Sequence, residues 1–103
     1  MGNEDFTIIK EVNPEGIRFT IKGRINSINV PMLQHKIDEA IRDQEIYMIL
    51  NMGAVEYLSS AGIRVILKTH KDLTRLGGQF GIEQPSENVR NVLGMAALDE
   101  MLI

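Results

Sequence analysis

Cysteine and tryptophan are absent from this 103-residue chain, and proline occurs three times. Without cysteine there is no disulfide framework, no Cys-ligated zinc site and no thiol nucleophile. The apolar runs fall far short of the roughly 20 residues that cross a bilayer, so we expect no direct membrane insertion. The first five residues, Met-Gly-Asn-Glu-Asp, lack the charged-then-apolar pattern of a signal peptide. We therefore expect a cytoplasmic protein.

Clustered positive charge is also lacking. The 11 basic residues are scattered along the chain and are outnumbered by 14 acidic residues, which leaves a net charge of -3. Because binding a polyanion normally requires clustered Lys and Arg, nucleic acid is not an expected partner. The length and the 44% content of hydrophobic residues are ordinary for one domain with one core, covering residues 1–103.

The apolar pattern predicts an α/β fold. Alternating apolar and polar residues on both sides of the turn residues 13–16 predict a hairpin. The spacing of apolar residues in the rest of the chain predicts helix, strand, helix, strand and helix. The expected architecture is one mixed sheet of four to five strands with helices packed on it. Residues 97–103 fit either a further helical turn or a strand. The expected ranges are 6–12 and 17–22 for the hairpin strands, 30–43 for the first helix, 46–51 for a strand, 60–76 for the second helix, 79–83 for a strand and 86–96 for the third helix.

Some local expectations are sharper. The uniformly apolar segment 46–51 predicts a central strand that is buried on both faces and ends near Gly53. Asn29 and Ser86 are candidate N-caps of the first and third helices. Gly77 and Gly78 are expected to stop the second helix.

The sequence offers little support for a catalytic role. A serine nucleophile needs a base, and the chain offers only His35 and His70. His70 lies ten residues after Ser60 in the same predicted helix, about 15 Å along its axis, whereas proton transfer requires roughly 3 Å. Gly-x-Ser-x-Gly, Gly-rich phosphate loops and metal-ligand spacings are missing as well. We expect no catalytic residue, no metal and no cofactor.

Two adjacent hydroxyls, on Ser59 and Ser60, lie where an apolar segment turns into the second predicted helix. The first turn of a helix has N–H groups without intrahelical partners and the positive end of the macrodipole, so a phosphate there is electrostatically favoured. The simpler interpretation is an N-cap, worth about 1 kcal/mol, with no further role. The local pattern leaves both interpretations open.

The wider pattern resembles the STAS-domain proteins, in particular the bacterial anti-sigma factor antagonists. The resemblance covers almost the whole chain, and its most specific part is the central block that follows a strand and opens a helix. It rests on Gly23-Arg24-Ile25-Asn26, on Ile49-Leu50-Asn51-Met52 running into Tyr57-Leu58-Ser59-Ser60-Ala61-Gly62-Ile63, on Leu76-Gly77-Gly78 and on Val92-Leu93-Gly94-Met95-Ala96-Ala97-Leu98.

The resemblance implies that Ser60 is phosphorylated by a partner kinase that is also the anti-sigma factor. Ser59 stands where that family usually has Asp, which makes it a rival acceptor, and Ala61 stands where the family has a second hydroxyl residue. Asn26 replaces another Asp that is frequent in the facing loop. The implied contact surface comprises Asn26, Ser27, Asn29, Ser59, Ser60, Ala61, Gly62 and Arg64.

The implied mechanism is partner switching. The unmodified protein binds the anti-sigma factor, a serine-protein kinase that uses ATP and Mg²⁺, and phosphorylation at Ser60 releases it; a phosphoserine phosphatase is a possible further partner. The alternative is a non-switching STAS scaffold or accessory subunit of a regulatory, transport or lipid-trafficking complex, which the two missing Asp residues favour. Sensing of a nucleotide or another ligand ranks last, because no motif requires a small molecule.

Overall fold

A computed structural model describes residues 6–103. Two strands, β1 (Phe6–Asn13) and β2 (Gly16–Ile25), form the expected hairpin. The remaining elements follow the predicted order, and each helix begins and ends within two residues of expectation. They are α1 (Val30–Arg42), β3 (Tyr47–Leu58), α2 (Ser60–Arg75), β4 (Gln79–Glu83), α3 (Glu87–Met95) and a short 3-10 turn over Asp99–Met101.

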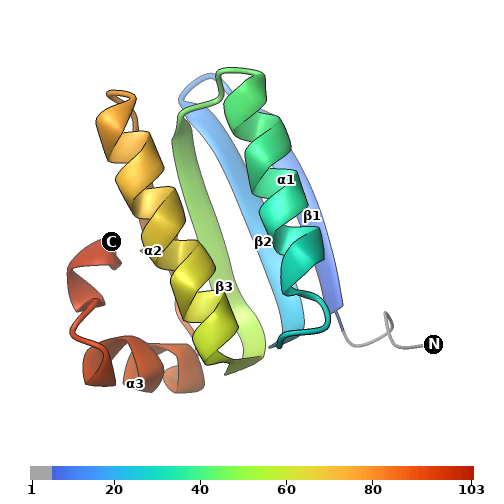
Figure 1. Cartoon of the computed structure of the whole chain (residues 1–103), viewed down its shortest axis with the longest axis vertical. Helices are drawn as coiled ribbons and strands as arrows, with labels where there is room; N and C mark the ends of the chain where they lie inside the picture. The colour runs from blue at the N-terminus through green and yellow to red at the C-terminus, as the bar shows by residue number, and fades with distance from the viewer. Residues whose placement is uncertain (1–5) are drawn as a thin grey trace.

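The four strands form one mixed sheet in the order β1-β2-β3-β4. The pair β1–β2 is antiparallel, whereas β2–β3 and β3–β4 are parallel. Both parallel connections step across the sheet in the same direction. Because such crossovers are right-handed, their helices lie on the same face, and α1 and α2 run side by side in front of the sheet (Figure 1). The helix α3 lies beyond them, near the end of β3 (Figure 1).

The core fills the space between this face and the helices. Alternate side chains of β2 and β3 meet apolar side chains of α1 and α2, and the fully buried ones include Phe19, Ile21, Ile25, Leu33, Ile37, Met48, Leu50, Met52, Ile66 and Leu73. Apolar burial of this extent is the main favourable term in folding. It also fixes where the strands end and α1 and α2 begin.

The expectation that residues 46–51 form a strand buried on both faces is wrong. Met48 and Leu50 point into the core, but Tyr47, on the opposite face, is 49% exposed. With both crossover helices on one face, no helix within residues 6–103 covers the other. An apolar run in a parallel strand therefore does not by itself establish burial on two sides.

Gly53 also does not end β3, which continues to Leu58. Register shifts interrupt its pairing with β2 between Thr20 and Lys22 and between Gly23 and Arg24. Each shift adds one residue to β3, so the buried positions after Met52 are spaced by three, at Val55 and Leu58. Such β-bulges remove the two-residue alternation by which strands are recognised in a sequence.

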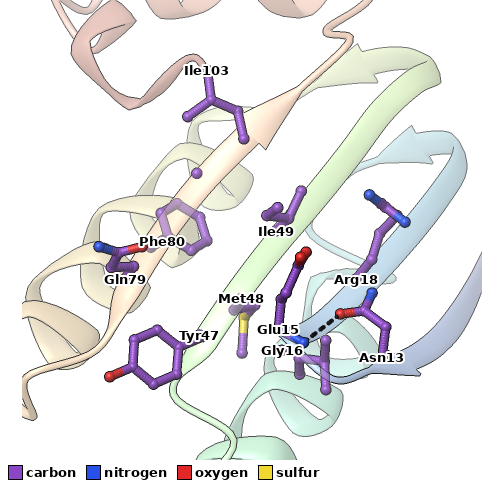
Figure 2. A pocket seen from close by; sticks show the side chains of 12 residues that line it. Asn13, Glu15, Gly16, Arg18, Tyr47, Met48, Ile49, Gln79, Phe80 and Ile103 are labelled. Atoms are coloured by element: carbon purple, nitrogen blue, oxygen red, sulfur yellow. Dashed lines mark hydrogen bonds between the residues drawn. The ribbon is translucent and has the colours of Figure 1, made fainter.

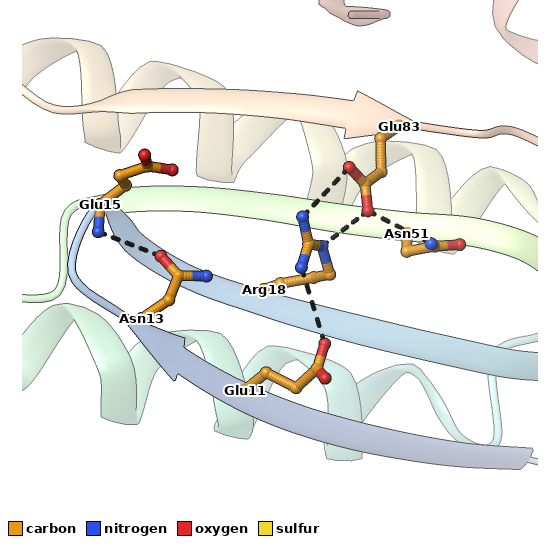
Figure 3. Close-up of polar contacts among 6 residues, drawn as sticks. All are labelled: Glu11, Asn13, Glu15, Arg18, Asn51 and Glu83. Carbon is orange, nitrogen blue, oxygen red and sulfur yellow. Dashed lines mark hydrogen bonds and ion pairs between the residues drawn. The ribbon is translucent and has the colours of Figure 1, made fainter.

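The uncovered face of the sheet carries a polar network (Figure 3). The Nε of Arg18 donates to Glu83 at 2.6 Å, and Asn51 donates to the same carboxylate at 3.2 Å. Glu11 lies 3.8 Å from the guanidinium. The hydrogen bond that Arg18 donates to Glu83, followed by the charge of Glu83, raises the pKa of Arg18 above its ordinary value. This network links β1, β2, β3 and β4 across the face that the helices leave open.

The closing segment combines both alternatives left open for residues 97–103. Asp99–Met101 form the 3-10 turn, and Leu102 then makes a parallel bridge to Ile82 of β4. No helix in residues 6–103 is long and apolar enough to span a bilayer.

Candidate functional site

The junction between β3 and α2 assigns different positions to the two serines. Ser59 is extended, with φ -80° and ψ 169°, and its Oγ accepts a hydrogen bond from the N–H of Gly62 at 3.2 Å. Its own N–H donates to the carbonyl of Ile25 at 2.9 Å. Ser59 is therefore the N-cap of α2, and its hydroxyl is engaged with the backbone.

Ser60 is the first helical residue and is exposed. The N–H of Ile63 bonds to the carbonyl of Ser59 at 3.0 Å, and that of Gly62 bonds to the cap. The N–H groups of Ser60 and Ala61 lie earlier in the first turn, and the first N–H groups of a helix have no carbonyl partner within the helix. Negative charge on the Ser60 hydroxyl would thus be placed at the positive end of the α2 dipole.

Gly62 packs the start of α2 tightly against the sheet. A Cβ atom at this position would lie 2.6 Å from Leu58 Cδ1 and 2.8 Å from Ile25 Cγ2. A larger residue would push the helix start away from the ends of β2 and β3. Gly62 is buried, so it shapes the site without presenting a side chain of its own.

The loop between β2 and α1 is held by its own asparagines. Asn26 Oδ1 accepts from the N–H groups of Ile28 and Asn29, at 2.9 and 3.1 Å, while Asn29 Oδ1 accepts from the N–H of Asn26 at 2.9 Å. Asn29 Nδ2 donates to the carbonyl of Arg24. Asn29 occupies the N-cap position of α1, but its side chain makes no capping bond. The predicted cap is thus correct in position and wrong in chemistry.

These two segments lie at the same end of the sheet. Ile25 is paired with Leu58 in the parallel β2–β3 ladder, so the loop after β2 and the helix after β3 begin side by side (Figure 1). We call residues 26–29 and 59–64 together the loop surface. It contains every residue expected at the partner contact. Ser27, Ser60 and Arg64 are exposed, Asn26, Asn29, Ser59 and Ala61 are half-buried, and Gly62 is buried.

Sequence reasoning missed the apolar part of this region. Ile28, within the loop, is 86% exposed, and Met32 in the first turn of α1 is 39% exposed. Arg24, at the end of β2, places its guanidinium 4.6 Å from the ring centre of Tyr57 on β3, a cation–π arrangement. In the sequence, an apolar residue in a short loop cannot be distinguished from the first apolar residue of the following helix, so its exposure was not predicted.

A hollow lies elsewhere on the molecule. About 280 Å³ is bounded by the first residues of β2, β3 and β4, on the uncovered face, and Ile103 borders it (Figure 2). Ser60 lies two residues after the last residue of β3, at the opposite end of the strands. Residues 6–103 also contain no cluster of three or more His, Asp or Glu residues that would hold a metal ion. This hollow is not lined by any residue of the loop surface.

The sequence and the fold match known proteins. Residues 7–102 match the STAS domain family model, and the chain belongs to the STAS domain family. It is 31% identical over 72 residues to BtrV of Bordetella bronchiseptica, a candidate anti-sigma factor antagonist. The aligned part covers 70% of this chain and 62% of BtrV, so the chain spans less than two thirds of this relative.

Solved structures of anti-sigma factor antagonists share the fold. The crystal structure of one from Mycobacterium paratuberculosis has a TM-score of 0.84 at 23% identity, covering 94% of this chain and 82% of that one. Unphosphorylated SpoIIAA has a TM-score of 0.82 at 22% identity, covering 95% and 85%. Phosphorylated SpoIIAA of Bacillus has 0.76 at 21% identity, covering 95% and 88%.

Proposed function

We propose that this chain is an anti-sigma factor antagonist that binds its partner through the loop surface and is released when Ser60 is phosphorylated. The observation that supports the proposal is the different environment of the two serines. Ser59 is used as the cap of α2, whereas Ser60 is exposed one residue later. Ser60 is therefore the acceptor we propose, with Ser59 as its rival.

The relatives supply the partner class. Proteins similar to this one are named anti-sigma factor antagonists, and SpoIIAA has been solved in both unphosphorylated and phosphorylated forms. These names support an anti-sigma factor as the partner, and the further part of the proposal, that this factor is also a serine kinase, rests on the family resemblance. This kinase supplies ATP and Mg²⁺, and a phosphoserine phosphatase would reverse the modification.

Electrostatics accounts for the direction of the switch. Phosphorylation adds about -1.5 to -2 charges at neutral pH. If Ser60 lies inside the contact, this charge must be desolvated on docking, which costs several kcal/mol unless the partner provides positive groups. A loss of about 4 kcal/mol corresponds to roughly a thousandfold weaker binding. The unmodified hydroxyl carries no such cost.

The test uses the anti-sigma factor kinases of the source genome, each purified and incubated with this protein, ATP and Mg²⁺. Mass spectrometry then locates the added phosphate in the wild type, in Ser60→Ala and in Ser59→Ala. We expect phosphate on Ser60 in the wild type and in Ser59→Ala, none in Ser60→Ala, and binding restored by phosphatase treatment. Phosphate on Ser59 alone would move the switch by one residue.

A non-switching scaffold is the second candidate. The observation that favours it is the loop surface itself, which contains no carboxylate at residues 26–29 or 59–64. Stable binding to an active kinase without any phosphate transfer would establish this alternative and overturn the switch.

A further inference from the structure

The inference concerns Ile28, whose exposure is not explained by the architecture of α1. Asn29 is at the N-cap position, so Ile28 precedes the cap and Leu33 is the fourth helical residue. These two positions commonly pack together as a hydrophobic staple. Here Leu33 is fully buried while Ile28 is 86% exposed. The isoleucine therefore does not serve its usual structural role at a helix start.

Hydrogen bonds restrain the backbone that carries this side chain. Its N–H donates to Asn26 Oδ1 at 2.9 Å, and Asn29 closes the same loop through Asn26 N–H and Arg24 O. A side chain presented by a braced loop loses little backbone freedom when it binds. Ile28 is thus pre-organised for insertion into a partner.

The loop that carries Ile28 begins beside the helix that carries the proposed acceptor. The N–H of Ser59 bonds to the carbonyl of Ile25 at 2.9 Å, which ties the start of α2 to the end of β2. Ile28 follows three residues after Ile25, and Ser60 follows directly after Ser59. A partner that contacts both segments of the loop surface would thus meet Ile28, which is 86% exposed, and could also reach Met32, which is 39% exposed.

The charge of the loop surface identifies the chemistry of the opposing face. Of its ten residues, Arg64 is the one with a charge. A basic face would meet no carboxylate here and would face Arg64, whereas an apolar face would match Ile28 and Met32. Complementary potentials fix the choice of partner in this way.

We propose that Ile28 is the apolar anchor of the partner contact and inserts into an apolar pocket of the anti-sigma factor, next to the part that covers Ser60. This inference rests on the proposed function and specifies its partner. It also strengthens the switch, because an apolar surrounding gives a phosphate on Ser60 no compensating hydrogen bonds.

The experiment measures binding of each purified anti-sigma factor kinase by calorimetry to the wild type, Ile28→Asp and Ile28→Lys. Ile9→Asp and Ile9→Lys are the matched controls, because Ile9 is 59% exposed on β1. If the Ile28 side chain is buried in the complex, its loss should raise Kd about ten- to hundredfold in both Ile28 variants. The Kd of both controls should change less than about twofold. Thermal unfolding should be unchanged at position 28, since its side chain is almost fully exposed.

Three results would overturn the inference. Wild-type affinity in both Ile28 variants would show that the anchor is absent, while the proposed function would stand. Opposite effects of Asp and Lys would replace the apolar pocket by a charged one. Failure of the wild type to bind any of these kinases would overturn the inference together with the proposed function.

Discussion

The helix-covered face of the sheet and the loop surface obey different constraints. On the covered face, Phe19 and Ile66 are fully buried, so their shape is fixed by packing. On the loop surface, backbone hydrogen bonds and one tightly packed glycine fix the geometry, while most side chains reach water. Packing in the core thus determines where the loop surface lies, and exposed side chains of the loop surface can be substituted without altering the fold.

The largest expected effect lies on the covered face. Phe19→Ala should lower the free energy of unfolding by about 3 to 5 kcal/mol, because it removes buried apolar surface and leaves a cavity. Ile9→Thr, on the uncovered face, should change it by no more than about 0.5 kcal/mol. Urea denaturation monitored by circular dichroism measures both. Similar losses at the two positions would refute the asymmetry of the sheet.

Gly62 joins the two regions, and its substitution comes next. Gly62→Ala places a Cβ within 3 Å of Leu58 and Ile25, and overpacking of this kind typically costs about 1 to 3 kcal/mol. A gain in helix propensity of about 1 kcal/mol offsets part of it. We expect a net loss of stability together with weaker kinase binding, because the start of α2 must shift.

Gly94→Ala in α3 is the matched control for Gly62, because nothing lies within 4 Å of its Cβ position. It should keep or raise stability by up to about 1 kcal/mol. Equal effects of the two substitutions would show that Gly62 is not packed as described.

The adjacent serines should separate stability from modification. Ser59→Ala removes the cap of α2 and should cost about 1 kcal/mol in urea denaturation, yet it should leave phosphate transfer in place. Ser60→Ala should change stability by less than about 0.5 kcal/mol and abolish transfer. If Ser60→Ala were the more destabilising variant, the assignment of cap and acceptor would be reversed.

The smallest effect concerns the surface of α2. The hydrogen bond from Lys68, followed by its charge and that of Arg75, lowers the pKa of Asp72. A lowered folded-state pKa gives stability that is present above the unfolded pKa and is lost as the pH falls through the folded one. Because Lys68 is largely exposed, we expect no more than about 0.5 kcal/mol. Asp72→Asn should remove this part of the acid-side slope in denaturation series between pH 6 and pH 2, and an unchanged slope would contradict it.

Sequence reasoning predicted the order of the elements because each helix has a clear apolar stripe and four of the connections, at residues 13–16, 26–29, 76–78 and 84–86, contain Gly, Pro or Asn. It missed the second half of β3, since the bulges replace alternation by a spacing of three at Met52, Val55 and Leu58. Burial of 46–51 on both faces was wrong because the position of the helices depends on the direction of two crossovers.

The candidate site was predicted in part. Ser60 and the two loops were found from their position between strand and helix and from the resemblance. That Ser59 is the cap, and that Asn29 braces a loop instead of capping α1, depend on individual hydrogen bonds. Ile28 was missed because exposure is a tertiary property that a single apolar letter does not reveal.

The two register shifts in β3 have a consequence for insertions and deletions. Ile25 pairs with Leu58, whereas Thr20 pairs with Asn51, so β3 is longer than β2 by two residues over this stretch. The number of residues between Asn51 and Leu58 therefore determines which serine is the cap and which is exposed. Loss of one residue there would place Ser60 in the capping position and Ala61 in the exposed one. A change in strand length would therefore remove the proposed acceptor from its exposed position without substituting either serine.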